Sequence, residues 1–198
     1  MKNIITLALL LLSFGSFAQT PSFKDVKGIA IGDTIENFSA LTKDSLTYNL
    51  RDDLAKGPTV VIFIRGYWCG YCNKHMSDLQ DSFDQITATG ANIIVVSPEK
   101  PEYLEKTAKK SGAEFTLLYD SACSIMKRFD VLWAPDKVME AKFKKYFGDE
   151  MKDSHSDDTQ RLPVPATYII GQDGVIIWRH FDRDYSQRST VKDILKNL

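Results

Sequence analysis

Cysteine and histidine are scarce in this chain of 198 residues, which contains three of each. A static disulfide framework normally uses more cysteines, in an even number, so a disulfide-stapled scaffold is not expected. Neither sign of charge is in excess, because 25 basic residues stand against 26 acidic ones and the formal net charge is −1. A near-neutral balance provides no electrostatic footprint for nucleic acid or for an anionic membrane. Neither is therefore expected as a partner.

The chain also lacks low-complexity tracts, internal repeats and a Gly/Ser linker of the kind that separates domains. Hydrophobic residues make up 43% and charged residues 26% of the sequence, which is typical of an ordered globule. About 180 residues are enough for one domain with a full core. We therefore expect residues 19–198 to form a single domain.

A mostly apolar run is present at the N-terminus. Lys2 precedes this run, residues 4–12, and small residues follow at Ser16 and Ala18. This order is typical of a secretory signal peptide. A permanent membrane anchor is the weaker alternative, because a spanning helix needs about 18–20 apolar residues. Residues 1–18 are thus predicted to be a signal peptide, and the mature protein to be exported, most simply to a bacterial periplasm, and free of the membrane.

Two of the cysteines, Cys69 and Cys72, are separated by two residues and can close a small disulfide ring. They follow an apolar run typical of a buried strand, about residues 59–65, and open a segment with helical spacing, about residues 69–87. A strand, a short Cys-x-x-Cys turn and a helix form the arrangement of a thioredoxin-like redox site. The unpaired N–H groups and the dipole of a helix N-terminus favour thiolate, the nucleophilic form. A reversible dithiol is therefore favoured over a permanent local disulfide.

The remaining periodic segments alternate between strand and helix. Strands are expected at 92–97 and 115–119, helices after Pro101 and at 121–129, a hairpin at 167–170 and 175–178, and a final helix with a capping box at Thr190 and Asp193. This order predicts a mixed sheet with helices on both faces.

Two stretches fit that alternation poorly. Residues 19–58 look like an irregular lead-in, with a short strand or a turn at residues 48–51. Residues 136–147 have the spacing of an inserted helix, and polar residues 148–160 follow it as a loop. The insertion either borders the redox site or has no role in function, and both alternatives stay open.

Three blocks of sequence carry a family pattern. They are Gly32-Asp33 with the strand leading to residues 65–72, Tyr119-Asp120 before a short helix, and residues 162–170 followed by Asp173-Gly174. Together they resemble the peroxiredoxin branch of the thioredoxin-like superfamily, often labelled AhpC/TSA-like. The resemblance implies an α/β thioredoxin-like fold, a mixed central sheet flanked by helices, with the inserted helix and loop before the final β-hairpin. It also implies an oxidoreductase that acts on thiol and disulfide groups.

The redox block departs from the family pattern. Peroxiredoxins carry Pro-x-x-x-Thr/Ser-x-x-Cys, whose cysteine attacks peroxide; here Arg65 replaces the proline, Cys69 the threonine, and Cys72 takes the peroxidatic position. The later catalytic arginine of the family has no counterpart, since Pro165 falls near its place. In thioredoxins the first cysteine is the nucleophile and a cis-proline lies beside it. By that resemblance Cys69 attacks, Cys72 resolves, and the Val164–Pro165 bond is expected to be cis.

Three functions are compatible with the pair. The leading one is an exported thiol-disulfide oxidoreductase and antioxidant protein, in which Cys69 attacks a protein or small-molecule disulfide and a partner protein supplies reducing equivalents, with no cofactor or metal. The second is a thiol peroxidase in which Cys72 attacks a hydroperoxide. The third is a copper(I) chaperone that uses Cys69, Cys72 and His75 as ligands. A surface histidine is the favoured interpretation of His75.

Several residues near the pair have two interpretations each. Arg65 could stabilise a thiolate or hold a substrate carboxylate, or it could pair with Asp182 or Asp184. Trp68 could offer an apolar surface to a partner or serve ordinary packing. Pro165 is expected to shape the groove for the substrate chain.

The third cysteine and the charged segment near the C-terminus are expected to lie outside the chemistry. Cys123 is favoured as a small buried hydrophobe over a distant resolving cysteine. The charged and aromatic residues of 181–188, which include Arg188, are expected to form a solvated face.

Overall fold

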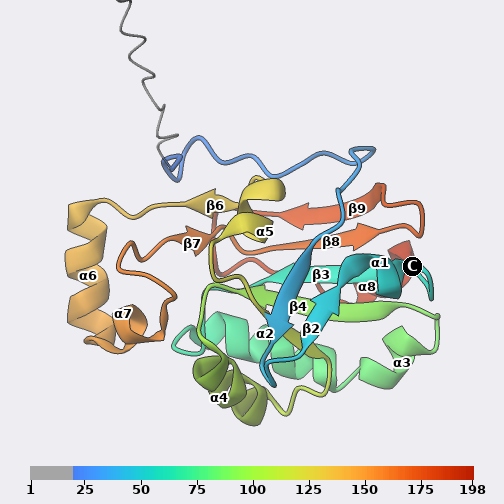
Figure 1. The fold of residues 1–198 in the computed structure, drawn as a ribbon, viewed down its shortest axis with the longest axis horizontal. Helices are drawn as coiled ribbons and strands as arrows, with labels where there is room; N and C mark the ends of the chain where they lie inside the picture. Colours follow the sequence, from blue (N-terminus) through green and yellow to red (C-terminus); the bar gives the residue numbers. More distant parts are fainter. Residues whose placement is uncertain (1–19) are drawn as a thin grey trace, which may run out of the picture.

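The computed structural model describes residues 20–198, so the predicted signal peptide, residues 1–18, lies outside it. Seven strands form one sheet (Figure 1). In spatial order they are β2 (Thr47–Asn49), β1 (Ser39–Thr42), β5 (Thr116–Tyr119), β4 (Asn92–Ser97), β3 (Thr59–Phe63), β8 (Ala166–Ile170) and β9 (Ile176–Phe181). The three central strands β3, β4 and β5 are parallel, and the flanking pairs are antiparallel. The predicted mixed sheet is confirmed.

Helices cover both faces of this sheet. They are α1 (Leu50–Leu54), α2 (Gly70–Gln80), α3 (Phe83–Thr87), α4 (Pro101–Ser111), α5 (Ser124–Arg128), α6 (Lys137–Phe147), α7 (Glu150–Ser154) and α8 (Val191–Asn197). Alternate residues of β3 face opposite sides: Val60 and Ile62 join the core under α2, α4 and α8, whereas Val61 and Phe63 join the core under α1 and α5. Within the described residues no helix is long and apolar enough to span a membrane.

The helix predicted over residues 69–87 is divided into α2 and α3. Ser82 between them has non-helical angles, φ −119° and ψ 14°. The helical spacing survives the break because Leu79 and Ile86 are both fully buried in the same core. Periodicity therefore predicted the buried face and missed the interruption.

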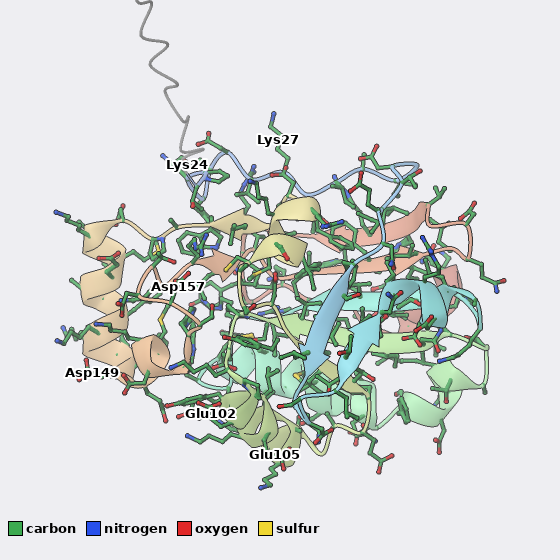
Figure 2. All side chains as sticks on the ribbon, in the orientation of Figure 1. Lys24, Lys27, Glu102, Glu105, Asp149 and Asp157 are labelled. Carbon is green, nitrogen blue, oxygen red and sulfur yellow. A yellow bond between two sulfur atoms is a disulfide. The ribbon has the colours of Figure 1, made fainter. Side chains whose placement is uncertain are left out.

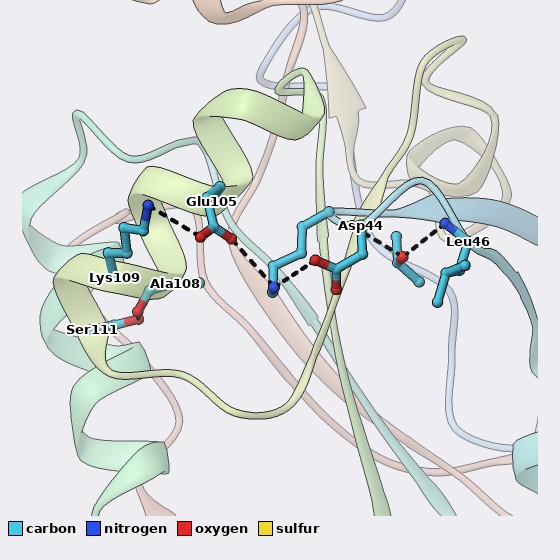
Figure 3. A network of polar contacts seen from close by, with 8 residues as sticks. Asp44, Leu46, Glu105, Ala108, Lys109 and Ser111 are labelled. Carbon is cyan, nitrogen blue, oxygen red and sulfur yellow. Dashed lines mark hydrogen bonds and ion pairs between the residues drawn. The ribbon is translucent and has the colours of Figure 1, made fainter.

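The prediction of an irregular lead-in was wrong for β1, whereas a short strand near residues 48–51 was one of the predicted alternatives and is present as β2. Strand β1 pairs with β5 and with β2, and so extends the main sheet by two strands. Both are short, and β1 gains its second partner from a strand some 75 residues away, which local pattern does not reveal. Figure 3 shows how the turn between β1 and β2 reaches α4. There Lys43 contacts Glu105 at 3.2 Å, and Glu105 contacts Lys109 at 3.3 Å.

The inserted segment lies between two strands that pair with each other, β6 (Leu132–Trp133) and β7 (Leu162–Pro163). Helices α6 and α7 lie beyond this pair, at one end of the molecule (Figure 1). The predicted helix is confirmed as α6. The predicted polar loop instead contains α7, because Met151 and Ser154 are buried and anchor a helical turn. Charged side chains such as Lys24 and Asp149 project from the periphery (Figure 2).

The C-terminal predictions are confirmed. Strands β8 and β9 form the antiparallel hairpin, and Thr190 opens α8 with a reciprocal capping box to Asp193. Between the two elements, the segment of residues 182–189 turns back across the end of α2, because Ser189 bonds to both His75 and Thr167.

Candidate active site

Cys69 and Cys72 form a disulfide at the N-terminus of α2. Cys69 is the N-cap residue, and its sulfur accepts the backbone N–H of Cys72 at 3.3 Å. Only 2% of Cys69 and none of Cys72 is exposed. The predicted strand, turn and helix are therefore present, with the sulfurs directed into the protein.

The turn before the pair requires a glycine. Gly66 has φ +150°, and a Cβ there would lie 2.4 Å from an oxygen of Glu99 and 2.6 Å from the indole nitrogen of Trp68. The same carboxyl group accepts the N–H of Tyr67 at 2.9 Å, and Asn73 donates to the Tyr67 carbonyl at 2.7 Å. Burial raises the pKa of Glu99 to about 8. Sequence reasoning missed Glu99, whose one signal is an acid two residues after the end of a buried strand.

Arg65 contacts the first sulfur. Its Nη2 donates to Cys69 Sγ at 3.3 Å, and its guanidinium lies 4.0 Å from the ring centre of Tyr185. Burial lowers the pKa of Arg65 to about 10. The alternative of an ion pair with Asp182 or Asp184 was wrong, because neither carboxylate is within ion-pair distance.

Arg188 contacts the second sulfur, and its predicted place on a solvated face was wrong. Its Nη2 lies 3.3 Å from Cys72 Sγ and 3.9 Å from Cys69 Sγ. Burial, followed by repulsion from Arg65, lowers the pKa of Arg188 to about 9. More than 110 residues separate it from the pair, so only the turn of residues 182–189 brings it there.

No carboxylate in residues 20–198 forms an ion pair with either arginine. A buried cation without a counter-ion is costly, and an anion placed beside it recovers part of that cost. The reduced pair supplies such an anion, because a thiolate at either sulfur lies within reach of a guanidinium. The electrostatics of the site therefore favour the nucleophilic form of the cysteines.

His75 is buried, so its predicted surface position was wrong. Only 5% of it is exposed, and its Nε2 lies 3.2 Å from Ser189 Oγ. Burial, with a smaller contribution from Arg188, lowers the pKa of His75 to about 4. In the described part of the chain, no cluster of three or more His, Cys, Asp or Glu residues could hold a metal ion. The geometry therefore gives the copper hypothesis no support.

Trp68 and Pro165 connect the dithiol to the inserted segment. Trp68 is 8% exposed and packs on α6, with its ring centre 4.6 Å from that of Phe147. Pro165 lines a groove of about 810 Å³ together with Arg65, Tyr185 and side chains of α6. The expected cis bond at Val164–Pro165 was wrong: residues 20–198 contain no cis peptide bond, and the trans form is the more stable one even before proline.

Cys123 lies apart from the pair, as the preferred interpretation stated. It is 2% exposed and belongs to the core on the opposite face of the sheet from Cys69 and Cys72. Burial raises the pKa of the Cys123 thiol to about 12. A resolving role would require it to cross the sheet.

A dithiol at a helix N-terminus, after the central strand of a mixed sheet with helices on both faces, defines a thioredoxin-like oxidoreductase. The model of the AhpC/TSA family matches residues 31–179, and the chain belongs to that family. It is an oxidoreductase that acts on thiol groups.

Individual relatives come from both branches of this chemistry. Peroxiredoxin Bcp of Escherichia coli is 29% identical over 108 residues, which cover 54% of this chain and 68% of that protein. Thiol-disulfide oxidoreductase ResA of Geobacillus thermodenitrificans is 25% identical over 132 residues, 66% of this chain and 74% of that protein. Among solved structures, peroxidoxin BcpB from Mycobacterium tuberculosis superposes with a TM-score of 0.65 at 16% identity, over 84% of this chain and 94% of that one. This last likeness concerns the fold.

Proposed function

We propose that this protein is an exported thiol-disulfide oxidoreductase, acting in the periplasm, that cycles Cys69 and Cys72 between dithiol and disulfide. The observation that carries the proposal is the position of two arginines against the two sulfurs: Arg65 is buried, Arg188 is half-buried, and neither has a carboxylate partner in residues 20–198. Export rests on the N-terminal sequence pattern, residues 1–18.

Cys69 is the proposed nucleophile. Its sulfur accepts hydrogen bonds from the Cys72 N–H and from Arg65, and it is the less enclosed of the two. The Cys69 thiolate attacks a substrate disulfide, bonds to one substrate sulfur and displaces the other as a thiolate. Cys72 then displaces the first substrate sulfur and closes the Cys69–Cys72 bond. The substrate gains two electrons and is released as a dithiol, and a second dithiol protein supplies two further electrons that reduce the Cys69–Cys72 bond and is itself oxidised to a disulfide.

Trapping tests this order. A Cys72→Ser variant should accumulate a mixed disulfide between Cys69 and the substrate, which dithiothreitol releases, whereas Cys69→Ser should accumulate none. Mass spectrometry of the quenched reaction identifies the bond. Mixed disulfide on Cys72 alone would refute Cys69 as the nucleophile, and none on either variant would refute the exchange activity.

A thiol peroxidase is the second candidate, because Arg188 lies against Cys72, the position that attacks peroxide in the family pattern. In that reaction the Cys72 thiolate attacks the hydroperoxide, becomes a sulfenic acid and releases water or an alcohol. The Cys69 thiol then condenses with the sulfenic acid, one water leaves in this step, and the same disulfide results.

Peroxide oxidation of the single-cysteine variants separates the two candidates. The peroxidase predicts rapid oxidation of Cys69→Ser, with a sulfenic acid that a cyclic diketone captures, and slow oxidation of Cys72→Ser. The oxidoreductase predicts slow peroxide oxidation of both variants and fast exchange with a protein disulfide.

A further inference from the structure

Helix α6 presents an apolar face that the rest of the described chain covers only in part, because its side chains pack against the core that contains Trp68 and yet stay partly exposed. None of its 11 residues is buried, although Met139, Phe143 and Phe147 follow one another at helical spacing. Tyr146 on the same helix is 72% exposed. A helix of a folded protein normally buries its apolar stripe, so α6 retains contact surface for another molecule.

This face forms one wall of the groove of about 810 Å³. Trp133, Pro165 and Tyr185 also line it, as does Arg65, which contacts the dithiol. Since the Arg65 guanidinium lines the groove and donates to Cys69 Sγ at 3.3 Å, one side chain separates the groove from the proposed nucleophile. Its volume is in the range of sites for large ligands and exceeds what a small peroxide requires.

The composition of the walls favours a polypeptide occupant. Aromatic residues, methionine and arginine are the types enriched in protein–protein contacts, and they dominate this groove. The groove also adjoins Pro163 and Pro165 at the end of the short strand β7, next to where a substrate cysteine has to lie.

The charge of the groove specifies the occupant further. Lys142 and Arg65 line it, and in the described residues neither has an acidic partner. Arg183 is held by the carbonyl groups of Lys24 and Val26, and Asp184 is the one acid in the lining. A groove that is mostly apolar and carries these basic side chains is complementary to a segment that is both acidic and hydrophobic.

We propose that this groove binds the polypeptide substrate of the dithiol, as an extended segment with an aromatic or large aliphatic residue beside Asp or Glu. The substrate cysteine then lies next to Arg65, in position for attack by Cys69. This specificity rests on the proposed function, and it assigns the inserted helix α6 the selection of substrate.

Binding is measured first, without any redox step. Three labelled peptides of equal length carry serine in place of the cysteine, flanked by Glu and Phe, by Lys and Phe, or by Glu and Ser. Fluorescence anisotropy with the oxidised protein should show the Glu–Phe peptide binding most tightly, by about fivefold over each of the others. Equal binding of the three peptides overturns the proposal.

Two lysines of α6 provide a matched pair of variants. Lys142 lines the groove, whereas Lys145, three residues further on, does not. Lys142→Glu should weaken the Glu–Phe peptide about fivefold and favour the Lys–Phe peptide, while Lys145→Glu, with the same net charge, should change either by less than about twofold. Tyr146→Ser should weaken both Phe peptides, and its exposed position leaves the fold intact. Equal effects of the two lysine variants overturn the proposal.

The redox arm separates this proposal from the proposed function. Reduced protein is mixed with disulfide forms of the three peptides and with hydroxyethyl disulfide. The groove predicts that Lys142→Glu slows only the acidic peptide. If no disulfide reacts while the order of peptide affinities holds, the proposed function is refuted and the groove proposal stands.

Two further outcomes overturn the polypeptide proposal. Displacement of the peptide by dodecanoate, at a concentration below that of peptide needed for binding, assigns the groove to a lipid. Dimerisation of the protein that Tyr146→Ser abolishes assigns it to a second copy of the chain.

Discussion

Cys69 and Cys123 occupy the same kind of position with opposite chemical results. Each is the N-cap residue of a helix, α2 or α5, and each is 2% exposed. Around Cys69 the backbone N–H of Cys72 and two arginines point at the sulfur. Around Cys123 the carboxylate of Asp120 takes the first N–H groups, those of Ile125 and Met126.

The nearby cations differ as well. Arg161 is the positive group that lowers the pKa of Cys123, and its charge is already paired with Asp157. Arg65 and Arg188 have no carboxylate partner in residues 20–198. A helix N-terminus therefore does not by itself make a reactive thiol. The donors must be free, and the neighbouring cations unpaired, before a buried sulfur is stabilised as thiolate.

The largest expected effect is the difference in reactivity between the two thiols. In the reduced protein at pH 7, Cys69 should react with iodoacetamide at least about a thousandfold faster than Cys123, because a thiol with a pKa near 12 is almost wholly protonated. Peptide mapping after timed quenching measures both rates. Cys123→Ala should leave disulfide exchange unchanged. Comparable alkylation rates for the two thiols would show that their surroundings do not make Cys69 the more reactive one.

Removal of one arginine beside the dithiol should reduce the difference in alkylation rate between Cys69 and Cys123. Arg188→Met should slow alkylation of Cys69 about tenfold at pH 7 and move the midpoint of its pH profile upward, because a cation beside sulfur favours thiolate. Arg161→Met is the control, since its charge is paired, and it should alter Cys123 by less than about twofold. An unchanged pH profile in Arg188→Met would show that the arginine does not stabilise the thiolate.

His75 should contribute no positive charge to the dithiol at neutral pH, and stability should reveal this. Its pKa is about 4 in the folded chain against an ordinary 6.5, so as pH falls from 6.5 to 4 the unfolded chain binds the proton first and stability is lost. His75→Gln, which can keep the bond to Ser189, should remove a loss on the order of 3 kcal/mol. Urea unfolding of both proteins at pH 7 and pH 4 measures the difference. Parallel losses in the two proteins would mean that His75 is not buried as a neutral ring.

The smallest effect is expected at the acid that distinguishes α5 from α2. Asp120→Asn keeps an acceptor for the helix N–H groups and removes the negative charge beside Cys123. Alkylation of Cys123 should rise by less than about threefold, because burial is the larger cause of its raised pKa. A rise of a hundredfold or more would show that the carboxylate, and not burial, keeps Cys123 inert.

Local sequence was enough for the central part of the fold. The apolar runs of β3 and β4, the turn residues of the β8–β9 hairpin and the capping box at Thr190 each carry a short-range signal with a known cause. The prediction missed strand β1 because this strand is stabilised by β5, its distant partner. The prediction missed helix α7 because the burial of Met151, which depends on tertiary contacts, overrides a polar local composition.

The sequence by itself determined the redox pair, its place at a helix N-terminus and the family frame around it, because spacing and periodicity act within a few residues. Only the tertiary structure decided what surrounds the sulfurs. The turn of residues 182–189 brings Arg188 to Cys72, burial makes His75 a neutral core residue, and the pairing of β6 with β7 places α6 beside Arg65. These contacts join residues distant in the chain, where desolvation and unpaired charge exist only after folding.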